Sequence, residues 1–549
     1  MSNRRILDSP VAIVGVGSAG GIAVGLSYPP WNVAWLVWIG LVPVAWLLVS
    51  APGNKAVYLG GCLAIFGFAL TALDWLRTCY LPDGFIGPQT NSWLLIAEVV
   101  AVGSVASFWL GRQIALRARA PMMIGLPLFW VTGEYLRYHI GTLITGQPLP
   151  WLHVGLPLGT NLVLAQVADI GGVWMLSALV AFVNGWMFDC IAVFQRPISL
   201  KTKARRLAIY VISGVTIIGS VAAYGQWRLA DRSSEVGPHV ALMPGKVNPA
   251  PHGSSRHTSQ LRGVDKSTGI DLILYPELSS QASIVYQSAG GRLKELPALS
   301  TVPSQVAKQS FLELARLVDA TIMVGAGRID EQAGQLHRYN SLACIAPESQ
   351  SMTVYDKIYL VPFREYTPRG LGWFRARGHS GLTRGTTRIP FVVKGRSNGR
   401  SYQVAPAICC EVAFPSHFLH QSWRGNDARG GVDFFVCASD EPPNRLDGLQ
   451  QILLLMTRLR AIESRRTIVR NVTNGCSGVV DGEGRVLYNV DLVPAGKAMS
   501  VGDIPISSTV SFYNTHGHRV PCAIAVATVL IALWYSDLPK KFGKRQMVM

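Results

Sequence analysis

The chain carries eight apolar segments of membrane-spanning length, and seven of them fall within its first 225 residues. A helix needs roughly 20 apolar residues to cross the hydrocarbon core of a bilayer, and each segment is close to that length. The sequence therefore predicts a polytopic α-helical membrane domain. The segments are residues 10–28, 31–49, 57–76, 93–110, 121–138, 170–188, 207–224 and 520–535.

The first segment has an alternative reading as a cleavable signal peptide, because Arg4 and Arg5 precede it and small residues follow. A second apolar segment begins almost at once, which favours a membrane anchor over a cleaved leader.

The composition is that of a membrane domain joined to a soluble one. Of 549 residues, 49% are hydrophobic and 15% are charged, and the mean hydropathy is +0.28. A net charge of +18 would suit nucleic-acid binding, but no basic stripe with interleaved aromatic residues accompanies it. Many Lys and Arg residues flank the apolar segments instead, so we read the basicity as membrane topology and expect no nucleic-acid partner.

The basic residues also predict an orientation. With the N-terminus in the cytoplasm, fifteen of them fall in inner loops and in the C-terminal tail, against Arg77 and Arg137 in the short outer loops. The long polar segment before the eighth helix then lies outside the cytoplasm. We expect a transmembrane domain at 1–225, a catalytic domain at 226–515, and an eighth helix with a cytoplasmic tail at 516–549. The fifteen are Arg4, Arg5, Lys55, Arg112, Arg117, Arg119, Arg196, Lys201, Lys203, Arg205, Arg206, Lys540, Lys541, Lys544 and Arg545.

Charged side chains inside the apolar segments need partners. Glu134 and Arg137 are three residues apart, on one helical face, and we expect them to form a structural ion pair. Glu98 has no sequence neighbour that would neutralise it, which leaves a functional role and a packing role both open.

Short β-rich runs alternate with helical patterns in the polar segment. This pattern predicts one domain in which helices cover buried sheets. The expected strands are 239–244, 271–277, 321–329, 339–347, 353–363, 389–394, 402–410, 432–439 and 467–473, with helices at 305–320 and about 447–464.

Three of these runs end in a residue able to do chemistry. Cys409 closes an apolar run, and the segment after it turns toward a helix, so we expect a lowered thiol pKa and nearby backbone N–H donors. Glu277 and Lys357 follow two other runs, which would supply a base and an oxyanion stabiliser. Each also has a structural reading: buried cysteine, solvated strand end and surface charge. The chain has nine cysteines but no C-x-x-C pair, so we expect neither a metal nor a cofactor.

Several motifs resemble a known enzyme superfamily. The stretches YPE at 275–277, YDKIYLVPFREYTP at 355–368 and ICCEVAFP at 408–415 are similar to the Glu, Lys and Cys motifs of the nitrilase (carbon–nitrogen hydrolase) superfamily. Four others resemble signatures of its membrane branch, the apolipoprotein N-acyltransferase family. They are YPPWNVAWLVWIGLVP at 28–43, W-x-x-x-E-x-x-R at 130–137, QVADIGGVWMLSALVAFVN at 166–184 and RLRAIESRRTIVRNVTNGCSGVVDGEG at 458–484.

The resemblance implies an αββα nitrilase-like sandwich on the periplasmic side of the cell inner membrane, in a monomer without cofactor. It implies acyl transfer from a phospholipid donor, through a cysteine thioester, to the N-terminal diacylglyceryl-cysteine of an apolipoprotein. Matched by motif, Glu277 is the base, Lys357 the oxyanion stabiliser and Cys409 the nucleophile. Glu365 and Glu411 match two supporting acids of the site.

The sequence departs from the family pattern near the site. Residues 439–443 replace an Asn-Asp-Ala-Trp-Phe loop, Leu453 stands where the family has a histidine, and Cys410 replaces a tyrosine. We expect these positions to affect substrate handling rather than the reaction type. A membrane-tethered amidase that hydrolyses a small amide is the alternative enzyme, and a non-catalytic scaffold is the third reading.

Overall fold

The computed structural model describes residues 9–77, 97–231 except 102 and 119, 234–243, 245, 269–280, 284–285, 304–332, 335–368, 381–422, 431–441, 448–490 and 499–537. The chain divides into two compact units. The first comprises Met1–Asp231, Leu446–Leu455 and His516–Met549, and the second comprises Arg232–Arg445 and Met456–Thr515.

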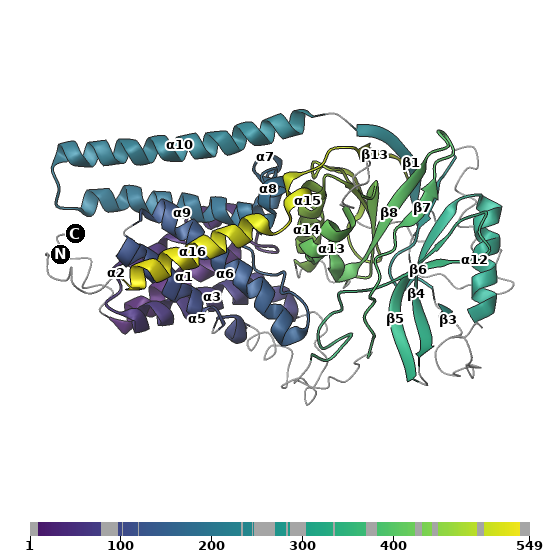
Figure 1. The fold of residues 1–549 in the computed structure, drawn as a ribbon, viewed down its shortest axis with the longest axis horizontal. Helices are drawn as coiled ribbons and strands as arrows, with labels where there is room; N and C mark the ends of the chain where they lie inside the picture. The colour runs from purple at the N-terminus through teal and green to yellow at the C-terminus, as the bar shows by residue number, and fades with distance from the viewer. Residues whose placement is uncertain are drawn as a thin grey trace. The chain divides into compact units, whose positions relative to one another are not determined.

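The first unit is helical (Figure 1). Among the described residues, four helices are long and apolar enough to cross a membrane: Asn54–Ala72, Ala97–Ala118, Val173–Gln195 and Leu200–Ala230. The elements of this unit are α1 (Pro10–Leu26), η1 (Ala34–Trp38), α2 (Val42–Ser50), α3 (Asn54–Ala72), η2 (Asp74–Arg77), α5 (Val105–Gln113), η3 (Ile114–Ala118), α6 (Met122–Thr145), η4 (Leu156–Thr160), α7 (Leu162–Ala165), α8 (Ala168–Gly171), α9 (Val173–Gln195), α10 (Leu200–Ala230) and α16 (Arg519–Asp537).

The expected apolar segment at 31–49 does not form one continuous helix. The short helix η1 ends at Trp38 and α2 begins at Val42. Pro43 lies in the first turn of α2, where its missing N–H costs no hydrogen bond, so the sequence starts a new helix there. The count of eight membrane-spanning helices remains a prediction.

Glu134 and Arg137 both lie on α6, but they do not form the direct ion pair that the sequence predicted. The Glu134 carboxylate accepts a hydrogen bond from Trp130 Nε1 at 2.9 Å and lies 2.8 Å from His153 Nδ1. Arg137 donates to the backbone carbonyls of residues 151–152, at 3.0 and 2.7 Å. Because the chain after α6 folds back along the helix, partners 14 to 19 residues away replace the neighbour three residues away. Glu98 is exposed.

The second unit contains two β-sheets. One has the strand order β13-β1-β2-β4-β5-β6, with β3 paired to β4, and the other has the order β12-β11-β10-β9-β8-β7. The strands are β1 (Ser234–Leu242), β2 (Leu272–Leu274), β3 (Ile284–Val285), β4 (Thr321–Gln332), β5 (Gln335–Ile345), β6 (Thr353–Asp356), β7 (Phe391–Lys394), β8 (Ser401–Ile408), β9 (Phe434–Ser439), β10 (Thr467–Val472), β11 (Ser477–Val480), β12 (Val486–Val490) and β13 (Met499–Ser507).

Helical elements accompany these strands (Figure 1). They are α12 (Ser304–Val318), η6 (Cys409–Ala413), α13 (Pro415–Ser422), α14 (Leu449–Ser464) and α15 (Phe512–His516). Every expected strand and both expected helices of this region have a counterpart. The patterns missed β3 and the three strands β11, β12 and β13.

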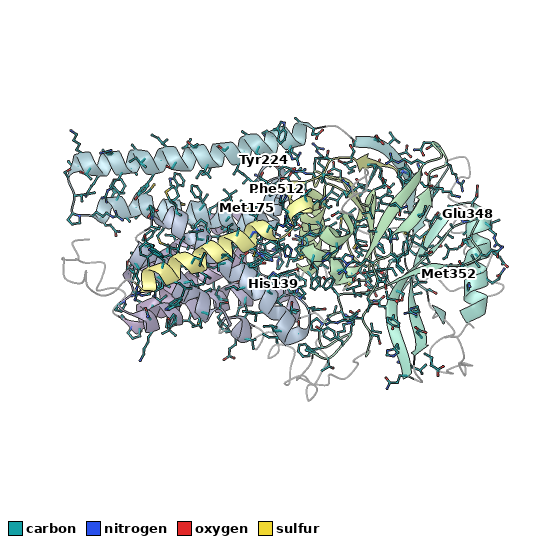
Figure 2. The ribbon with its side chains drawn as sticks, in the orientation of Figure 1. His139, Met175, Tyr224, Glu348, Met352 and Phe512 are labelled. Atoms are coloured by element: carbon teal, nitrogen blue, oxygen red, sulfur yellow. The ribbon has the colours of Figure 1, made fainter. Side chains whose placement is uncertain are left out.

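The two sheets pack face to face with helices outside them. Side chains from both sheets, such as Leu274 on β2 and Val436 on β9, share one buried core. The other face of the first sheet packs against α12, and Met352, labelled in Figure 2, belongs to that second core. Phe435 points out of the sandwich, because side chains alternate along a strand, and its ring lies 4.6 Å from that of Phe418 on α13.

Within each sheet the strands at the centre are parallel. β1, β2 and β4 run parallel in the first sheet, and β8, β9 and β10 run parallel in the second. Parallel neighbours end at the same edge, so residues that follow them are brought together.

Candidate active site

Glu277 follows β2 in a segment that crosses closely over β4. A Cβ atom at Gly325 would lie 2.4 Å from the Pro276 carbonyl oxygen and 2.6 Å from the Leu278 backbone nitrogen. Only glycine leaves the space for that crossing. The Glu277 side chain is buried there, with 6% of its surface exposed.

Lys357 directly follows β6 and is held by backbone hydrogen bonds on both sides. Its N–H donates to the Asn340 carbonyl at 2.8 Å, and its own carbonyl accepts from the Gly385 N–H at 2.9 Å. The side chain is 1% exposed, and Nζ lies 3.2 Å from Glu277 Oε1 and 2.9 Å from Glu365 Oε1. One ammonium group therefore lies between two buried carboxylates.

Asn340 on β5 completes this cluster and was missed by the sequence patterns. Its Nδ2 donates to Glu277 Oε1 at 2.7 Å and to Glu365 Oε1 at 3.4 Å. The second oxygen of Glu365 accepts from the Val361 N–H at 2.7 Å. Position 340 lies between Tyr339 and Ser341, so the local pattern carries no signal that singles it out.

Cys409 lies where β8 ends and η6 begins. Its φ is 54°, in the left-handed region that residues with a side chain seldom adopt. Its thiol lies close enough to the Glu277 carboxylate for the two groups to shift each other's pKa. Cys410 contacts another group, with Sγ 3.4 Å from the Tyr359 carbonyl oxygen.

Glu411 is completely buried and ties two segments of the site together. Its Oε1 accepts from the Tyr355 hydroxyl at 2.8 Å and the Ile358 N–H at 2.7 Å. Its Oε2 accepts from the Ile408 N–H at 2.8 Å. Glu411 thus joins the end of β8, directly before Cys409, to the segment that follows β6.

Glu277 and Lys357 are both charged in this arrangement. Burial alone would raise the pKa of Glu277, but the Lys357 ammonium and hydrogen bonds from Asp440 and Asn340 lower it below its ordinary value. Burial alone would lower the pKa of Lys357, but the carboxylates of Glu277 and Glu365 raise it well above its ordinary value.

The expected lowering of the Cys409 pKa is wrong. Burial raises the pKa of this thiol well above its ordinary value, the Glu277 carboxylate raises it further, and Lys357 only partly opposes them. Cys409 is thus a neutral thiol beside an ionised carboxylate. This arrangement suits proton transfer to Glu277 during attack better than a preformed thiolate.

Two family models match the chain. The apolipoprotein N-acyltransferase N-terminal domain matches residues 20–186, and the carbon-nitrogen hydrolase domain matches residues 246–513. An apolipoprotein N-acyltransferase from Rhodopseudomonas palustris is 25% identical over 94% of this chain and 94% of its own length. One from Geobacter metallireducens is 24% identical over 93% of each. The chain is thus similar to apolipoprotein N-acyltransferases along almost its whole length.

The second unit accordingly has a nitrilase-like fold. Among solved structures, an amidase of the nitrilase superfamily from Nesterenkonia is 19% identical, with a TM-score of 0.33. The match covers 50% of this chain and 93% of the amidase.

The departure from the family pattern at 439–443 lies closer to Glu277 than expected. The Asp440 N–H donates to Glu277 Oε2 at 2.8 Å, so this segment contacts the carboxylate itself. The expectation that these positions affect substrate handling stays a prediction, and Pro442 and Pro443 lie outside the described residues. Leu453 is a buried residue of α14.

Proposed function

We propose that this protein transfers an acyl chain from a phospholipid to the N-terminal amine of a diacylglyceryl-cysteine on an apolipoprotein. The observation that supports it most is the cluster of Glu277, Lys357 and Cys409 in a chain that is similar to apolipoprotein N-acyltransferases along almost its whole length. An ionised carboxylate, an ammonium group and a neutral thiol are the groups that acyl transfer through a thioester requires.

In the first step Cys409 Sγ forms a bond to an ester carbonyl carbon of the phospholipid, and its proton moves to Glu277. Lys357 stabilises the negative charge that develops on the carbonyl oxygen. When the bond from the carbonyl carbon to the glycerol oxygen breaks, that oxygen takes the proton from Glu277. The products are an acyl thioester on Cys409 and a lysophospholipid.

In the second step the α-amino nitrogen of the acceptor attacks the thioester carbonyl carbon. Glu277 takes a proton from the amine, and Lys357 again faces the developing oxyanion. The carbon–sulfur bond then breaks, the sulfur recovers the proton from Glu277, and an amide is formed. Glu365 and Glu411 support these steps, Glu365 through Lys357 and Glu411 through the backbone next to Cys409 and Lys357.

The membrane setting belongs to the same proposal. We infer a multi-pass inner-membrane protein, active as a monomer, with a transmembrane domain at 1–225, a periplasmic catalytic domain at 226–515, and an eighth helix with a cytoplasmic tail at 516–549. Both substrates then reach the site from the outer leaflet.

The test uses the full chain in vesicles whose phospholipid carries isotope-labelled acyl chains, together with a synthetic diacylglyceryl-cysteine peptide. We expect labelled acyl-protein before the peptide is added, and labelled amide on the peptide afterwards. Turnover of small amides without any acyl transfer would identify an amidase instead, and no reaction with either substrate would identify a non-catalytic scaffold.

A further inference from the structure

A buried ion pair connects β9 and β10 close to the active-site edge of their sheet. Glu441 follows β9, and Arg470 is in β10; their side chains are 1% and 2% exposed and are joined by a salt bridge. β9 and β10 are parallel neighbours, with Ser439 opposite Val472. The mechanism described above does not use either charge.

Arg470 is held in one orientation by two further groups. Its Nε donates to the Cys476 carbonyl at 3.0 Å, and its Nη1 donates to the Thr457 hydroxyl at 3.4 Å. A Cβ atom at Gly475 would lie 2.4 Å from Glu441 Oε2, so the chain leaves space there for the carboxylate.

Glu441 is anchored along its backbone as well as by its carboxylate. Its carbonyl accepts from Asn474 Nδ2 at 2.9 Å, and its Oε1 accepts from the Ser439 hydroxyl at 3.3 Å. The Ser439 carbonyl accepts from the Thr473 N–H at 3.1 Å. Both residues that flank Asp440 are thus fixed to β10 or to the segment after it.

The hydrogen bonds and the salt bridge of Ser439 and Glu441 together orient the Asp440 N–H. It donates to Glu277 Oε2 at 2.8 Å, opposite the oxygen that contacts Lys357 and Asn340. We propose that the Glu441–Arg470 pair is a positioning device that holds the Asp440 N–H on the Glu277 carboxylate and thereby keeps this base ionised. The proposal rests on the role of Glu277 in the proposed function.

The electrostatic effect of the pair has to be separated from its effect on geometry. The charges of Glu441 and Glu277 repel each other, so substituting Glu441 alone would change the charge near the base. A single substitution would also leave one buried charge without its partner, which is strongly destabilising. Among the described residues, the titratable groups that interact with Glu277 are Lys357, Cys409, Cys410, Cys437 and Glu441. Glu365 and Arg470 join this cluster through their ion pairs with Lys357 and Glu441.

The test variant is therefore the double substitution Glu441→Ala with Arg470→Met, which leaves the net charge unchanged. A buried pair replaced by apolar residues is often tolerated, and the thermal melting of the variant checks that it folds. A hydrogen bond to a charged group shifts a pKa by about one unit when it is lost. We expect the acid limb of the pH–rate profile for acyl-enzyme formation to move up by about one pH unit. The rate should fall about tenfold at pH values below this limb and change little at pH 8.

The matched control removes another buried pair of the same unit by Arg460→Met with Glu463→Ala. These side chains are each 3% exposed and 2.7 Å apart, and Arg460 contacts the Ala413 carbonyl rather than Glu277. The acid limb should stay in place in this control. An unmoved limb in the folded Glu441→Ala and Arg470→Met protein, or an equal shift in the control, would overturn the proposal.

A second readout keeps this inference separate from the proposed function. In a Cys410→Ala background, the pH dependence of Cys409 alkylation by iodoacetamide reports the same base without any lipid substrate. A shifted alkylation limb in a protein that forms no acyl-enzyme would support the positioning role while refuting acyl transfer. An unshifted alkylation limb beside normal acyl transfer would refute only the positioning role.

Discussion

Cys409 and two residues near the other candidate catalytic groups have backbone conformations that residues with a side chain seldom adopt. Leu278, Phe363 and Cys409 have φ values of 46°, 65° and 54°. Such a conformation costs about 1–3 kcal/mol each and persists only where surrounding contacts impose it. Here the contacts include the hydrogen bond from the Phe363 N–H to the Tyr366 carbonyl, at 2.7 Å. The clustering of these residues at one edge is consistent with a site whose geometry is built at some cost in stability.

Lys357 offers a substitution whose structural and catalytic effects can be separated. Lys357→Met should lower the rate of acyl-enzyme formation about 100- to 1000-fold, as expected for the loss of one oxyanion donor. It should also destabilise the fold by about 3–5 kcal/mol, because two buried carboxylates lose their counter-charge. The double variant Lys357→Met with Glu365→Gln restores the original charge of the cluster.

We therefore expect the double variant to recover thermal stability while its rate stays at least about 100-fold low. Single-turnover kinetics and thermal melts provide the two measurements. A double variant that recovers both stability and rate would show that Lys357 acts only on structure.

The elements of the second unit follow closely from local sequence patterns. The alternation of β-rich runs and helical periods predicted the strands up to β10 except β3, and motif residues at three strand ends lie together. Asn340 could not be found this way, because its role depends on the pairing of β4 with β5 and on a carboxylate 63 positions away. The hydrogen bond from the Asp440 N–H to Glu277 could not be predicted either, because any residue type except proline supplies a backbone N–H.

Elements of the first unit show where apolar length misleads. The segment at 31–49 has enough apolar residues for one span, yet Pro43 starts a second helix within it. The prediction of a lowered pKa for the Cys409 thiol was wrong because it considered only the local sequence. The end of a strand suggested nearby donors, whereas the buried position and the carboxylate beside Cys409 dominate.

At the scale of the whole molecule, the charge distribution predicts which side of the membrane each unit faces. Reporter fusions after Lys55, Arg119 and Arg206 should give a cytoplasmic signal, and a fusion at Gly290 should give an external one. The physical reason is that loops rich in Lys and Arg are retained in the cytoplasm. A cytoplasmic signal at Gly290 would contradict access to substrates from the outer leaflet.

Acyl transfer through a thioester requires that Cys409, and not the adjacent Cys410, carries the acyl chain. Intact-mass spectrometry of the purified chain after incubation with phospholipid distinguishes the two thiols, with Cys409→Ala and Cys410→Ala measured in parallel. We predict one added acyl group, removable by hydroxylamine, on the unsubstituted protein and on Cys410→Ala, and no added mass on Cys409→Ala. An acyl group that persists in Cys409→Ala and disappears in Cys410→Ala would instead assign the thioester to Cys410.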